Sequence, residues 1–497
     1  MVSGWEEHQS PTFGPPSIVF KGRLWSADEV AAIAAGWLDI LHASIPRTAG
    51  LTAMLMSNHP HSIALLFALS SLPLPVIVYH SDPRAWRSSP PVPAETLLFV
   101  PPSLAEMAAS DSLGLSTLVL PAPRLPSAAT GPVPFLTGPG FVNFTSGSTG
   151  LPKPVYITTQ SFLLQTAAII EACQLSAGSP VAASLQLSTH YGLGQALFLP
   201  TVLGSPLGLL ERFDHRSLLG LFASGRYAYW AGTPVMADML TRAPLSAPRP
   251  AVPPICHISA GKLSTRVFDA FAERFGVRLR PNYGQTENGF ITVDTAPVEQ
   301  IRPDCVGRAA PGIEVRIGDN PLDPYPPGRQ GPVWFTSPWY MEGYGFPPRL
   351  APREGRQGWW PTADVGFLDE SGYLTLAGRA DDCFKTAAGY LVNPGEIAHA
   401  LTSHPDVTEV IVMPVQRSHG PVIGALVECD GAIDPDELRA TAARMLPPWL
   451  RPDVVVMTGR LPRLTGGKAD REACQGVLRE ARGRCEPGSS HSNVSGG

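Results

Sequence analysis

The sequence predicts an α/β protein that combines a large N-terminal domain of helix-flanked sheets with a small α+β C-terminal domain. Up to about residue 375, helical patterns alternate with short apolar runs typical of strands, and this order implies a parallel sheet covered by helices. From Pro303 to Trp360 the pattern changes to short strands with proline and glycine turns, which are expected to form a β-barrel-like subdomain. The 497 residues are too many for one hydrophobic core, so two or more domains are expected.

The elements of the large domain follow one another in a regular order. Residues 26–45 have apolar residues at helical spacing, and Ser26 with Glu29 has the spacing of a capping box. The apolar stretch 63–79 contains two prolines and two serines, which favours a buried helix followed by a buried strand over a membrane span. Short strands are expected at 75–79, 96–100, 116–121, 226–232, 312–319, 331–337 and 372–378.

The segment 378–382 is expected to mark the domain boundary. A compact pattern follows it, with helices expected at 393–405 and 434–446 and strands at 407–415 and 424–431. The predicted domains are therefore 1–379 and 380–485. The remaining residues, 486–497, are rich in Ser and Gly and are predicted to be a disordered tail.

Composition excludes several classes of protein. The net charge is −5 and only 16% of residues are charged, so no basic surface for nucleic acid is expected. Seven cysteines, an odd number without a C-x-x-C spacing, indicate neither a disulfide framework nor a zinc site, and favour a reducing cytoplasm. The N-terminus lacks the basic and apolar regions of a signal peptide. The sequence thus predicts a cytoplasmic protein without a membrane span.

The stretch FVNFTSGSTGLPKPV, residues 141–155, is rich in Ser, Thr and Gly and contains Lys153. Such a loop can direct backbone N–H groups and hydroxyls at one anion, and a lysine adds a positive charge. Phosphate is the expected ligand, and a solvated hairpin turn is the alternative. A Walker A loop is excluded because Lys153 follows a proline and no Gly-Lys-Ser/Thr run is present.

Five motifs together resemble those of the acyl-adenylate-forming (ANL) superfamily, which includes acyl- and aryl-CoA ligases, adenylation domains and luciferases. TSGSTGLPK resembles the phosphate loop, NYGQTE the Y-G-x-T-E motif, and GWWPTADVG the G-W-x-x-T-G-D motif. GRADDCFKTAAGYLVNPGEI resembles the hinge with its following loop, and LPRLTGGKADR the C-terminal lysine motif. They occur in the family's order across more than 300 residues.

The resemblance implies a two-step reaction, in which a carboxylate attacks the α-phosphate of ATP and a thiol then displaces AMP. It implies that Thr286 contacts the α-phosphate, that Glu287 holds Mg²⁺, and that Lys468 stabilises the attacking carboxylate from a mobile small domain, with Asp381 as the hinge. The implied ATP- and AMP-binding residues are Thr145, Ser146, Gly147, Ser148, Thr149, Gly150, Lys153, Ala260, Gly261, Asn282, Tyr283, Gly284, Asp364 and Arg379.

Some of these residues have individual roles within that set. Tyr283 is expected to stack on adenine and Asp364 to accept both ribose hydroxyls, with Arg379 assisting from the other side. The alternatives are a core tyrosine at 283 and a solvated carboxylate at 364. Glu287 and Lys468 have the same alternative of a solvated surface group, and Asp381 that of an ordinary turn aspartate.

The acyl pocket is expected to begin in YGLGQA, which is similar to a segment of benzoate-type CoA ligases. The candidate substrate-binding residues are His190, Tyr191, Gly192, Gln195, Gly284 and Phe290. Glycines at 192 and 194 favour a flat slot for a planar ring, and a neutral His190 offers an acceptor to an ortho amine. We therefore expect a substituted benzoate, with anthranilate the leading candidate. A packing histidine is the alternative at 190.

Three positions depart from the family's pattern. Pro154 follows the loop lysine, Ala363 precedes Asp364, and the loop after the hinge is longer, with Ala388 and Gly389 at the expected CoA tunnel. The expected activity is that of an AMP-forming aryl-CoA ligase using ATP, Mg²⁺ and coenzyme A. The departures keep one alternative open, a stand-alone adenylation enzyme that loads a carrier protein. An inactive nucleotide-binding paralogue is the other alternative.

Overall fold

The computed structural model describes residues 13–82, 90–93, 95–105, 115–123, 135–145, 152–244, 251–351, 353, 355–387, 390–392, 394–417, 420–429, 433–463 and 469–481. The chain divides into two compact units. The first comprises Met1–Thr362 and Gly366–Leu376, and the second comprises Ala363–Val365 and Ala377–Gly497. Each unit has its own hydrophobic core, and the domain boundary predicted at residues 379 and 380 stays a prediction.

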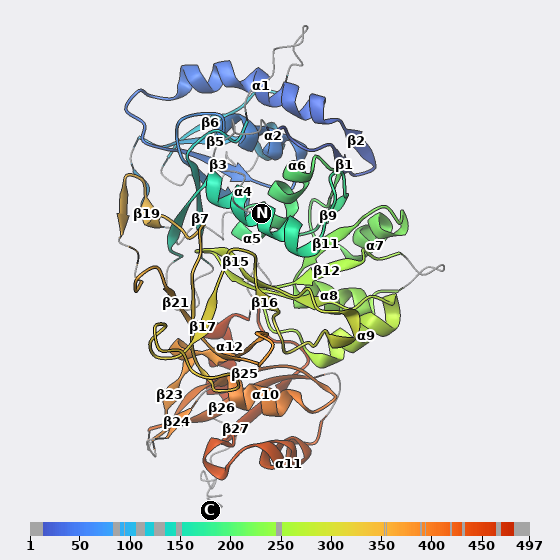
Figure 1. Cartoon of the computed structure of the whole chain (residues 1–497), viewed down its shortest axis with the longest axis vertical. Coiled ribbons are helices and arrows are strands. Elements are labelled where there is room, and N and C mark those ends of the chain that lie inside the picture. The colour runs from blue at the N-terminus through green and yellow to red at the C-terminus, as the bar shows by residue number, and fades with distance from the viewer. Residues whose placement is uncertain are drawn as a thin grey trace, which may run out of the picture. The chain divides into compact units, whose positions relative to one another are not determined.

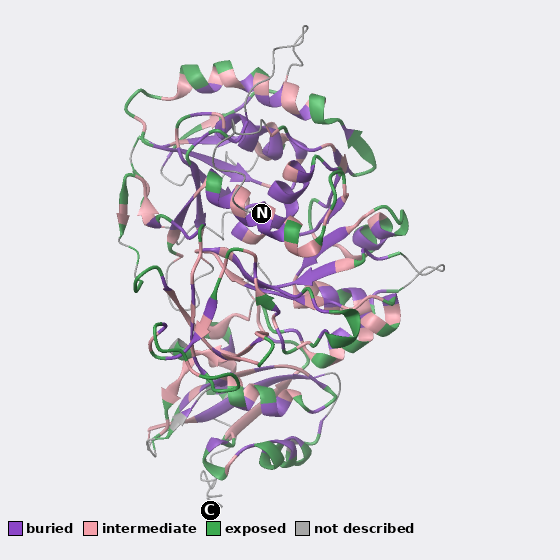
Figure 2. Ribbon diagram, in the orientation of Figure 1, coloured by how far each residue is buried: buried purple, intermediate pink, exposed green. Residues whose placement is uncertain are grey.

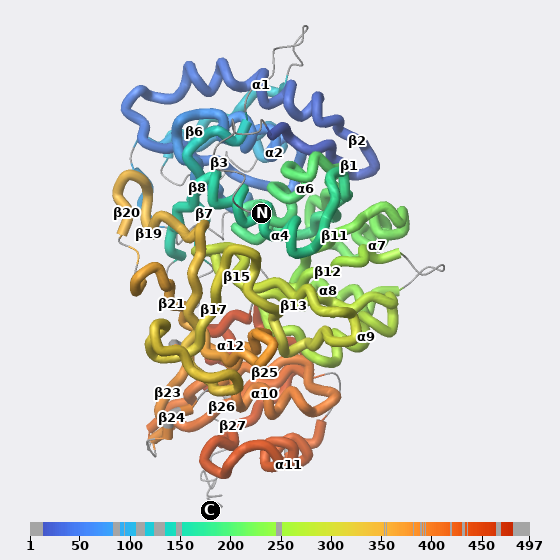
Figure 3. The backbone as a smooth tube through the Cα atoms, in the orientation of Figure 1, coloured from blue at the N-terminus to red at the C-terminus, as the bar shows by residue number. Residues whose placement is uncertain are grey.

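An eight-stranded sheet forms one layer of the first unit (Figure 1). Its order is β20-β19-β8-β7-β4-β3-β5-β6, and the run from β7 to β6 is parallel. The strands are β3 (Thr52–Met56), β4 (Val76–His80), β5 (Leu97–Val100), β6 (Ser116–Val119), β7 (Gly140–Phe144), β8 (Pro154–Thr158), β19 (Gly343–Phe346) and β20 (Arg349–Ala351). Strands β8, β19 and β20 are antiparallel to their neighbours, and the tube in Figure 3 shows β7, β8, β19 and β20 at one side of the unit.

A seven-stranded sheet forms the second layer. Its order is β13-β12-β11-β9-β10-β1-β2, and only β2 runs antiparallel to its neighbour. The strands are β1 (Ile18–Phe20), β2 (Arg23–Trp25), β9 (Val181–Ala183), β10 (Leu207–Leu209), β11 (Tyr229–Gly232), β12 (Ile255–Ile258) and β13 (Arg280–Pro281). Parallel strands buried on both faces read as continuous apolar runs, as β3 and β11 do.

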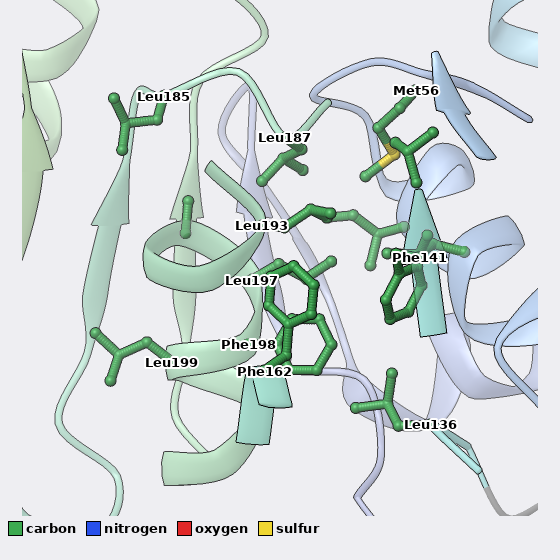
Figure 4. Packing of buried hydrophobic residues seen from close by; sticks show 14 of the residues in the cluster. Met56, Leu136, Phe141, Phe162, Leu185, Leu187, Leu193, Leu197, Phe198 and Leu199 are labelled. Atoms are coloured by element: carbon green, nitrogen blue, oxygen red, sulfur yellow. The ribbon is translucent and has the colours of Figure 1, made fainter. Parts of the chain in front are cut away.

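Helices contribute buried residues to the main core together with strands of the two sheets. They are α1 (Ala27–Ser44), α2 (Pro60–Leu69), α4 (Thr159–Cys173), α5 (His190–Gly192), the π-helix η4 (Leu193–Phe198) and α6 (Leu199–Leu203). Figure 4 shows Phe162 of α4 against Phe198 of η4, with Phe141 of β7 beside them. The Phe162 and Phe198 rings stack at 4.7 Å between centroids, and Phe141 meets both edge-on.

A second set of helices covers the outer face of the seven-stranded sheet. Helices α7 (His215–Ala223), α8 (Pro234–Arg242) and α9 (Thr265–Phe275) pack on β11 and β12 in a separate cluster around Trp230. Their apolar residues recur at helical spacing while the opposite faces are exposed, as the burial colours of Figure 2 show. Short 3₁₀ turns lie at η3 (Pro102–Leu104) and η5 (Val298–Gln300).

Two small sheets follow the seven-stranded sheet in the chain. One contains β14 (Tyr283–Gln285), β15 (Gly289–Val293) and β16 (Arg308–Ala309), and the other contains β17 (Val315–Ile317), β18 (Gly331–Phe335), β21 (Trp360–Leu368) and β22 (Leu374–Arg379). The chain passes from the first unit to the second within β21 and β22.

The second unit is α+β. Its elements are η6 (Ala380–Asp382), β23 (Phe384–Lys385), β24 (Leu391–Val392), α10 (Pro394–Thr402), β25 (Val407–Arg417), β26 (Gly420–Cys429), α11 (Pro435–Met445), η7 (Pro448–Leu450), β27 (Val454–Thr458) and α12 (Arg471–Ala481). Helices α10 and α11 cover one face of the three-stranded sheet, and α12 covers the other.

The fold class predicted from the sequence is confirmed. Residues 63–79 form α2 and β4, as the two prolines indicated, and no helix in the described ranges is long and apolar enough to cross a membrane. The capping box at α1 is only half formed. Ser26 Oγ accepts the N–H of Glu29 at 3.0 Å, but the Glu29 carboxylate pairs with Arg23 rather than with the Ser26 backbone. The predicted tail, 486–497, lies outside the described residues.

Candidate active site

The segments that follow β11, β12 and β13 meet at the carboxyl edge of the seven-stranded sheet, and they contain several of the predicted site residues. The N–H of Ser259, just after β12, donates to Gly232 O at the end of β11 at 3.2 Å. The N–H of Asn282, just after β13, donates to Ile258 O at 3.0 Å, and Ser259 Oγ donates to Asn282 O at 3.2 Å. Loops at the carboxyl ends of parallel strands are the usual ligand sites of open α/β sheets.

The predicted phosphate loop connects β7 to β8 as a hairpin connection. Thr145 and Lys153 hold its two ends together, because the Thr145 N–H donates to Lys153 O at 3.0 Å and the Lys153 N–H donates to Thr145 Oγ1 at 3.0 Å. The phosphate-loop residues Ser146, Gly147, Ser148, Thr149 and Gly150 lie outside the described residues. The structure therefore places the base of the loop and the lysine, and the phosphate-binding role stays a prediction.

The TEN turn lies at the tip of the β14–β15 hairpin. Gln285 pairs with Gly289, so Thr286, Glu287 and Asn288 form the connecting turn, and Gly289 adopts φ +75°. The Asn288 amide, fully buried, donates to Phe290 O at 2.6 Å and holds the turn from inside. Gly284 is required there because a Cβ would lie 2.1 Å from Gly289 O.

Tyr344 connects this turn to the phosphate loop, and sequence reasoning missed it. Its hydroxyl donates to Glu287 Oε1 at 2.7 Å, and Lys153 Nζ lies 5.3 Å from the centroid of its ring. Tyr344 is 57 residues from Glu287 in the chain, so no local spacing could have revealed the contact. The sheet brings them together, because β19 pairs with β8 directly after the loop.

The expected adenine-binding residues take different environments. Ala260 and Gly261 are exposed, and Ala260 adopts φ +67°, a left-handed conformation that is uncommon outside glycine. Tyr283 is only 7% exposed and packs in the main core, which is the alternative weighed for this residue. Its stacking on adenine stays a prediction.

His190 is held in one tautomer by Gln165. The Gln165 amide nitrogen donates to Ser161 O at 3.3 Å, so its carbonyl oxygen faces His190 Nε2 at 2.9 Å. A carbonyl oxygen only accepts, so Nε2 carries the proton and Nδ1 is left as an acceptor. Burial lowers the pKa of His190 to about 3, which keeps the ring neutral. Nδ1 is buried without a hydrogen-bond partner among the described residues.

The His190 ring is also fixed by packing. It stacks on Phe162 with 4.6 Å between centroids, so the aromatic cluster of the main core sets its plane. Gly289 approaches its edge closely, since a Cβ there would lie 2.7 Å from His190 Nε2 and 2.0 Å from Gln165 Oε1. Gly192 serves a different purpose from the expected flat slot. Its Cβ would lie 1.9 Å from Gln186 O, so its space is taken by the chain itself.

A second buried polar network lies next to Phe290. The Tyr229 hydroxyl donates to Gln195 Oε1 at 2.7 Å and lies 3.0 Å from His257 Nδ1, which must then donate to it. His257 Nε2 lies 3.8 Å from Cys173 Sγ, and its ring meets Phe290 edge-on. This network connects Gln195, a predicted substrate-binding residue, to three residues that the sequence did not single out.

Asn282, predicted to bind the nucleotide, is 4% exposed and lies beside the Tyr191 hydroxyl, with which its side chain interacts. Tyr191, another predicted substrate-binding residue, donates its hydroxyl to Gly232 O at 3.3 Å and meets Phe290 edge-on. Burial raises the pKa of Tyr191, so the phenol stays protonated.

The second unit brings two predicted nucleotide residues together. Arg379 NH1 lies 3.7 Å from Asp364 Oδ1, on the neighbouring strands β22 and β21. Asp381 lies in η6, and the adjacent Asp382 makes two contacts of 3.2 Å with the guanidinium of Arg471. The predicted CoA-tunnel residues Ala388 and Gly389 lie outside the described residues.

Lys468 also lies outside the described residues, but both ends of its loop are described. Arg463 forms an antiparallel bridge with Ala469 and binds Glu409 at 2.7 Å and Glu428 at 2.9 Å. The Asp470 N–H donates to Pro462 O at 2.8 Å. The two described ends of this segment are thus held together by backbone contacts, and partly buried ion pairs anchor Arg463.

A divalent cation fits the residues present only together with a ligand. In the part of the chain that the structure describes, no three His, Cys, Asp or Glu side chains are gathered as a metal site. Glu287 offers one carboxylate at the tip of the hairpin, and Mg²⁺ characteristically takes one or two carboxylates and completes its shell with water and substrate phosphates. Glu287 therefore fits a cation that a bound phosphate helps to hold, and the binding of Mg²⁺ stays a prediction.

Comparison with known proteins places these features in a family. Residues 52–345 match the model of the AMP-binding enzyme family, and residues 396–468 match the AMP-binding enzyme C-terminal domain. The chain is 27% identical to human acyl-coenzyme A synthetase ACSM2A over 66% of its own length and 59% of the relative's. It spans about three fifths of the length of the first curated relatives that it matches.

Two further proteins are matched over nearly their whole length. Feruloyl-CoA synthase of Amycolatopsis sp is 27% identical over 86% of this chain and 89% of its own. The solved amide bond synthetase McbA of Marinactinospora thermotolerans is 26% identical, with a TM-score of 0.78, over 94% of this chain and 97% of its own. As the five motifs predicted, the chain belongs to the AMP-binding enzyme family, within the ANL superfamily.

Proposed function

We propose that this protein activates a carboxylic acid with ATP to an acyl-adenylate and then transfers the acyl group to coenzyme A. The observation that supports this most is the placement of Lys153 and Glu287 on two loops that one residue, Tyr344, connects. A cation and a carboxylate held together beside a phosphate loop are what a metal–triphosphate complex requires.

The residues act mainly by neutralising charge and by orientation. The attack brings a carboxylate to a phosphate, so positive charge at Lys153 and Lys468 lowers the barrier that two anions face. Thr286 holds the α-phosphate, and Asp364 accepts the ribose hydroxyls with Arg379 beside it. Glu287 would hold Mg²⁺, and the ion would supply positive charge against the phosphates.

We infer that the acid is aromatic and carries an N–H or O–H donor. His190 presents a neutral Nδ1 acceptor, buried and unpartnered within the described chain, next to a stack of aromatic rings. A donor on the ring of the substrate would satisfy it, and an amine ortho to the carboxylate makes anthranilate the leading candidate. Feruloyl-CoA synthase, matched over most of both chains, supports an aromatic acid.

A second candidate replaces the thiol by an amine as acceptor. McbA, matched over nearly its full length, is an amide bond synthetase, and the loop after Asp381 departs from the CoA-ligase pattern. An acyl-adenylate reacts with either nucleophile, so adenylation is common to both candidates. Loading of a carrier protein is a third outcome for the same adenylate.

Pyrophosphate release with ATP and Mg²⁺ tests the first step. The acids are benzoate, anthranilate, 2-hydroxybenzoate, 4-hydroxybenzoate, cinnamate, octanoate and phenylalanine, each alone, with CoA, and with a simple primary amine. We expect anthranilate to exceed benzoate, and aryl-CoA to form only when CoA is present. A strong preference for octanoate would overturn the aromatic assignment, and an amide without any thioester would favour the second candidate.

His190→Phe separates the donor hypothesis from simple packing. It keeps a buried ring on Phe162 and removes the Nδ1 acceptor, so the preference for anthranilate over benzoate should fall about tenfold. His42→Ala, an exposed histidine of α1, is the control and should leave the preference unchanged. An unchanged preference in His190→Phe would make His190 a packing residue.

A further inference from the structure

Tyr344 touches both charged groups of the proposed phosphate site, although it belongs to neither motif. Its hydroxyl lies 2.7 Å from Glu287 Oε1 and its ring lies 5.3 Å from Lys153 Nζ. A carboxylate is acceptor-only, so the phenol donates, and a hydrogen bond to an ionised acceptor is among the stronger ones. An ammonium within about 6 Å of an aromatic centroid is attracted to the ring.

Backbone hydrogen bonds around Tyr344 also connect the TEN turn to β8. The N–H of Met341 donates to Glu287 O at 2.8 Å, and the N–H of Glu342 donates to Tyr156 O at 2.9 Å. Gly343 and Tyr344 then pair with β8 just beyond Lys153. The segment 341–344 therefore fastens the TEN turn to the strand that ends the phosphate loop.

The Tyr344 side chain thus projects from a well-paired strand rather than from a loose loop. Tyr344 is half-buried, on a strand held on one side by β8 and on the other by β20. Its hydroxyl takes one of the two oxygens of Glu287 and so limits rotation of the carboxylate. The other oxygen is the one that we assign to the cation.

We propose that Tyr344 is a positioning residue that sets the Glu287 carboxylate for a divalent cation and the Lys153 ammonium for phosphate as one unit. The inference rests on the proposed binding of ATP with Mg²⁺. The proposal has two parts that can be tested separately, because the hydroxyl acts on Glu287 and the ring acts on Lys153. A hydrogen-bonding partner behind a metal ligand commonly contributes about 10- to 100-fold to metal affinity.

Isothermal titration of the full chain with ATP at a series of Mg²⁺ concentrations tests the action of the hydroxyl on Glu287. In Tyr344→Phe, the Mg²⁺ concentration needed for half-maximal ATP affinity should rise about tenfold. ATP affinity at saturating Mg²⁺ should stay within about twofold, because the ring under Lys153 is kept. Tyr344→Leu removes the ring as well and should weaken ATP binding even at saturating Mg²⁺.

The matched control is Tyr325→Phe. Tyr325 donates its hydroxyl to Asp319 at 2.6 Å, the same phenol–carboxylate contact at an exposed site in the same unit. It should leave the Mg²⁺ dependence unchanged. Tyr344→His keeps an aromatic ring with an N–H donor and should recover part of the loss, which also covers the case in which Tyr344→Phe does not fold.

A double-mutant cycle with Glu287→Gln isolates the contact itself. If Tyr344 acts through Glu287, Tyr344→Phe should change the Mg²⁺ dependence of Glu287→Gln less than about twofold. A wild-type Mg²⁺ dependence in Tyr344→Phe, or full additivity with Glu287→Gln, would overturn the inference. If the wild-type chain binds no ATP at any Mg²⁺ concentration, the proposed function fails instead, and the two failures are distinguished.

Discussion

Thr145 and Lys153 form a reciprocal pair of hydrogen bonds across the two ends of the β7–β8 connection. The Thr145 N–H donates to Lys153 O, and the Lys153 N–H donates to Thr145 Oγ1, both at 3.0 Å. The threonine side chain therefore adds one hydrogen bond between the two chain segments where the pairing of β7 with β8 ends. The two bonds hold Thr145 and Lys153 together at the base of the connection.

Replacing Thr145 by valine should weaken ATP binding because the loop base loses its side-chain acceptor while the shape is kept. The contact is exposed, so we expect a stability change of about 1 kcal/mol or less and a fall of about three- to tenfold in ATP affinity. Titration of Thr145→Val and Thr145→Ser with ATP·Mg²⁺ measures the affinity. Thr145→Ser keeps the oxygen and is the control. Equal affinities in the serine and valine variants would show that the side-chain bond is unimportant.

Removing Lys468 should abolish most adenylation while leaving ATP binding nearly intact. A cation that acts mainly in the transition state typically contributes about 10²- to 10³-fold to the rate. ATP–pyrophosphate exchange in Lys468→Ala measures the rate, and titration with ATP measures binding. Arg479→Ala removes an exposed cation of α12 in the same unit and should have no effect. Undiminished exchange in Lys468→Ala would contradict the mechanism.

Gly289→Ala should damage the His190–Gln165 pair. The new Cβ would lie 2.0 Å from Gln165 Oε1, and the residue already has φ +75°, so we expect a loss of about 1–3 kcal/mol in stability. The KM for the acid should rise at least about tenfold, because the acceptor on His190 is displaced. Steady-state kinetics with varied acid measures it.

Gly220→Ala is the control for that variant. Gly220 lies in α7 with open space around its Cα, so alanine there should be neutral or stabilising by up to about 1 kcal/mol. Its KM for the acid should equal that of the wild type. If both glycine variants had the same KM, close packing at Gly289 would have no part in acid binding.

Stability should fall as the pH falls below about 6.5. Burial lowers the pKa of His190 and of His257 to about 3, so neither takes a proton in the folded protein above that pH. The unfolded chain binds protons at these histidines from about pH 6.5 downward, so it holds more protons than the folded state. The free energy of unfolding then decreases by up to about 1.4 kcal/mol per pH unit for each histidine.

Urea midpoints between pH 7.5 and 4.5 measure this slope. The double variant His190→Gln, His257→Gln lacks both groups, so its midpoint should depend less steeply on pH, whatever its absolute stability. His42→Ala removes an exposed histidine and should keep the wild-type slope. A double variant with the wild-type slope would assign the acid sensitivity to other groups.

Tyr229→Phe should destabilise the first unit by about 1–3 kcal/mol, because it leaves two buried groups without their hydrogen-bond partner. Gln195 Oε1 loses its donor and His257 Nδ1 loses its acceptor, and both groups are buried. Denaturant midpoints measure the loss. Tyr325→Phe removes only an exposed hydroxyl contact and should change little. Equal midpoints for the two variants would show that the buried network is unimportant for stability.

Much of the fold and the motif residues could be predicted because their signals are local. Apolar runs at strand length and helical spacing identified α1, α2, β4 and β11, since burial of one face or of both leaves a period in the sequence. The phosphate loop, which stays a prediction, and the TEN turn could be proposed from the sequence because their residues are consecutive. The half-formed capping box at Glu29 could not be foreseen, since Arg23 competes for its carboxylate.

The sequence by itself determined the superfamily and the fold class, and it predicted the residues for the nucleotide chemistry, because each rests on neighbours in the chain. Only the tertiary structure decided how those residues are oriented. Tyr344 reaches Glu287 across 57 positions, Gln165 sets the tautomer of His190 across 25, and Tyr229 binds Gln195 across 34. Such contacts depend on strand order and helix packing, and a hydrogen bond between distant residues leaves no spacing by which the sequence alone could reveal it.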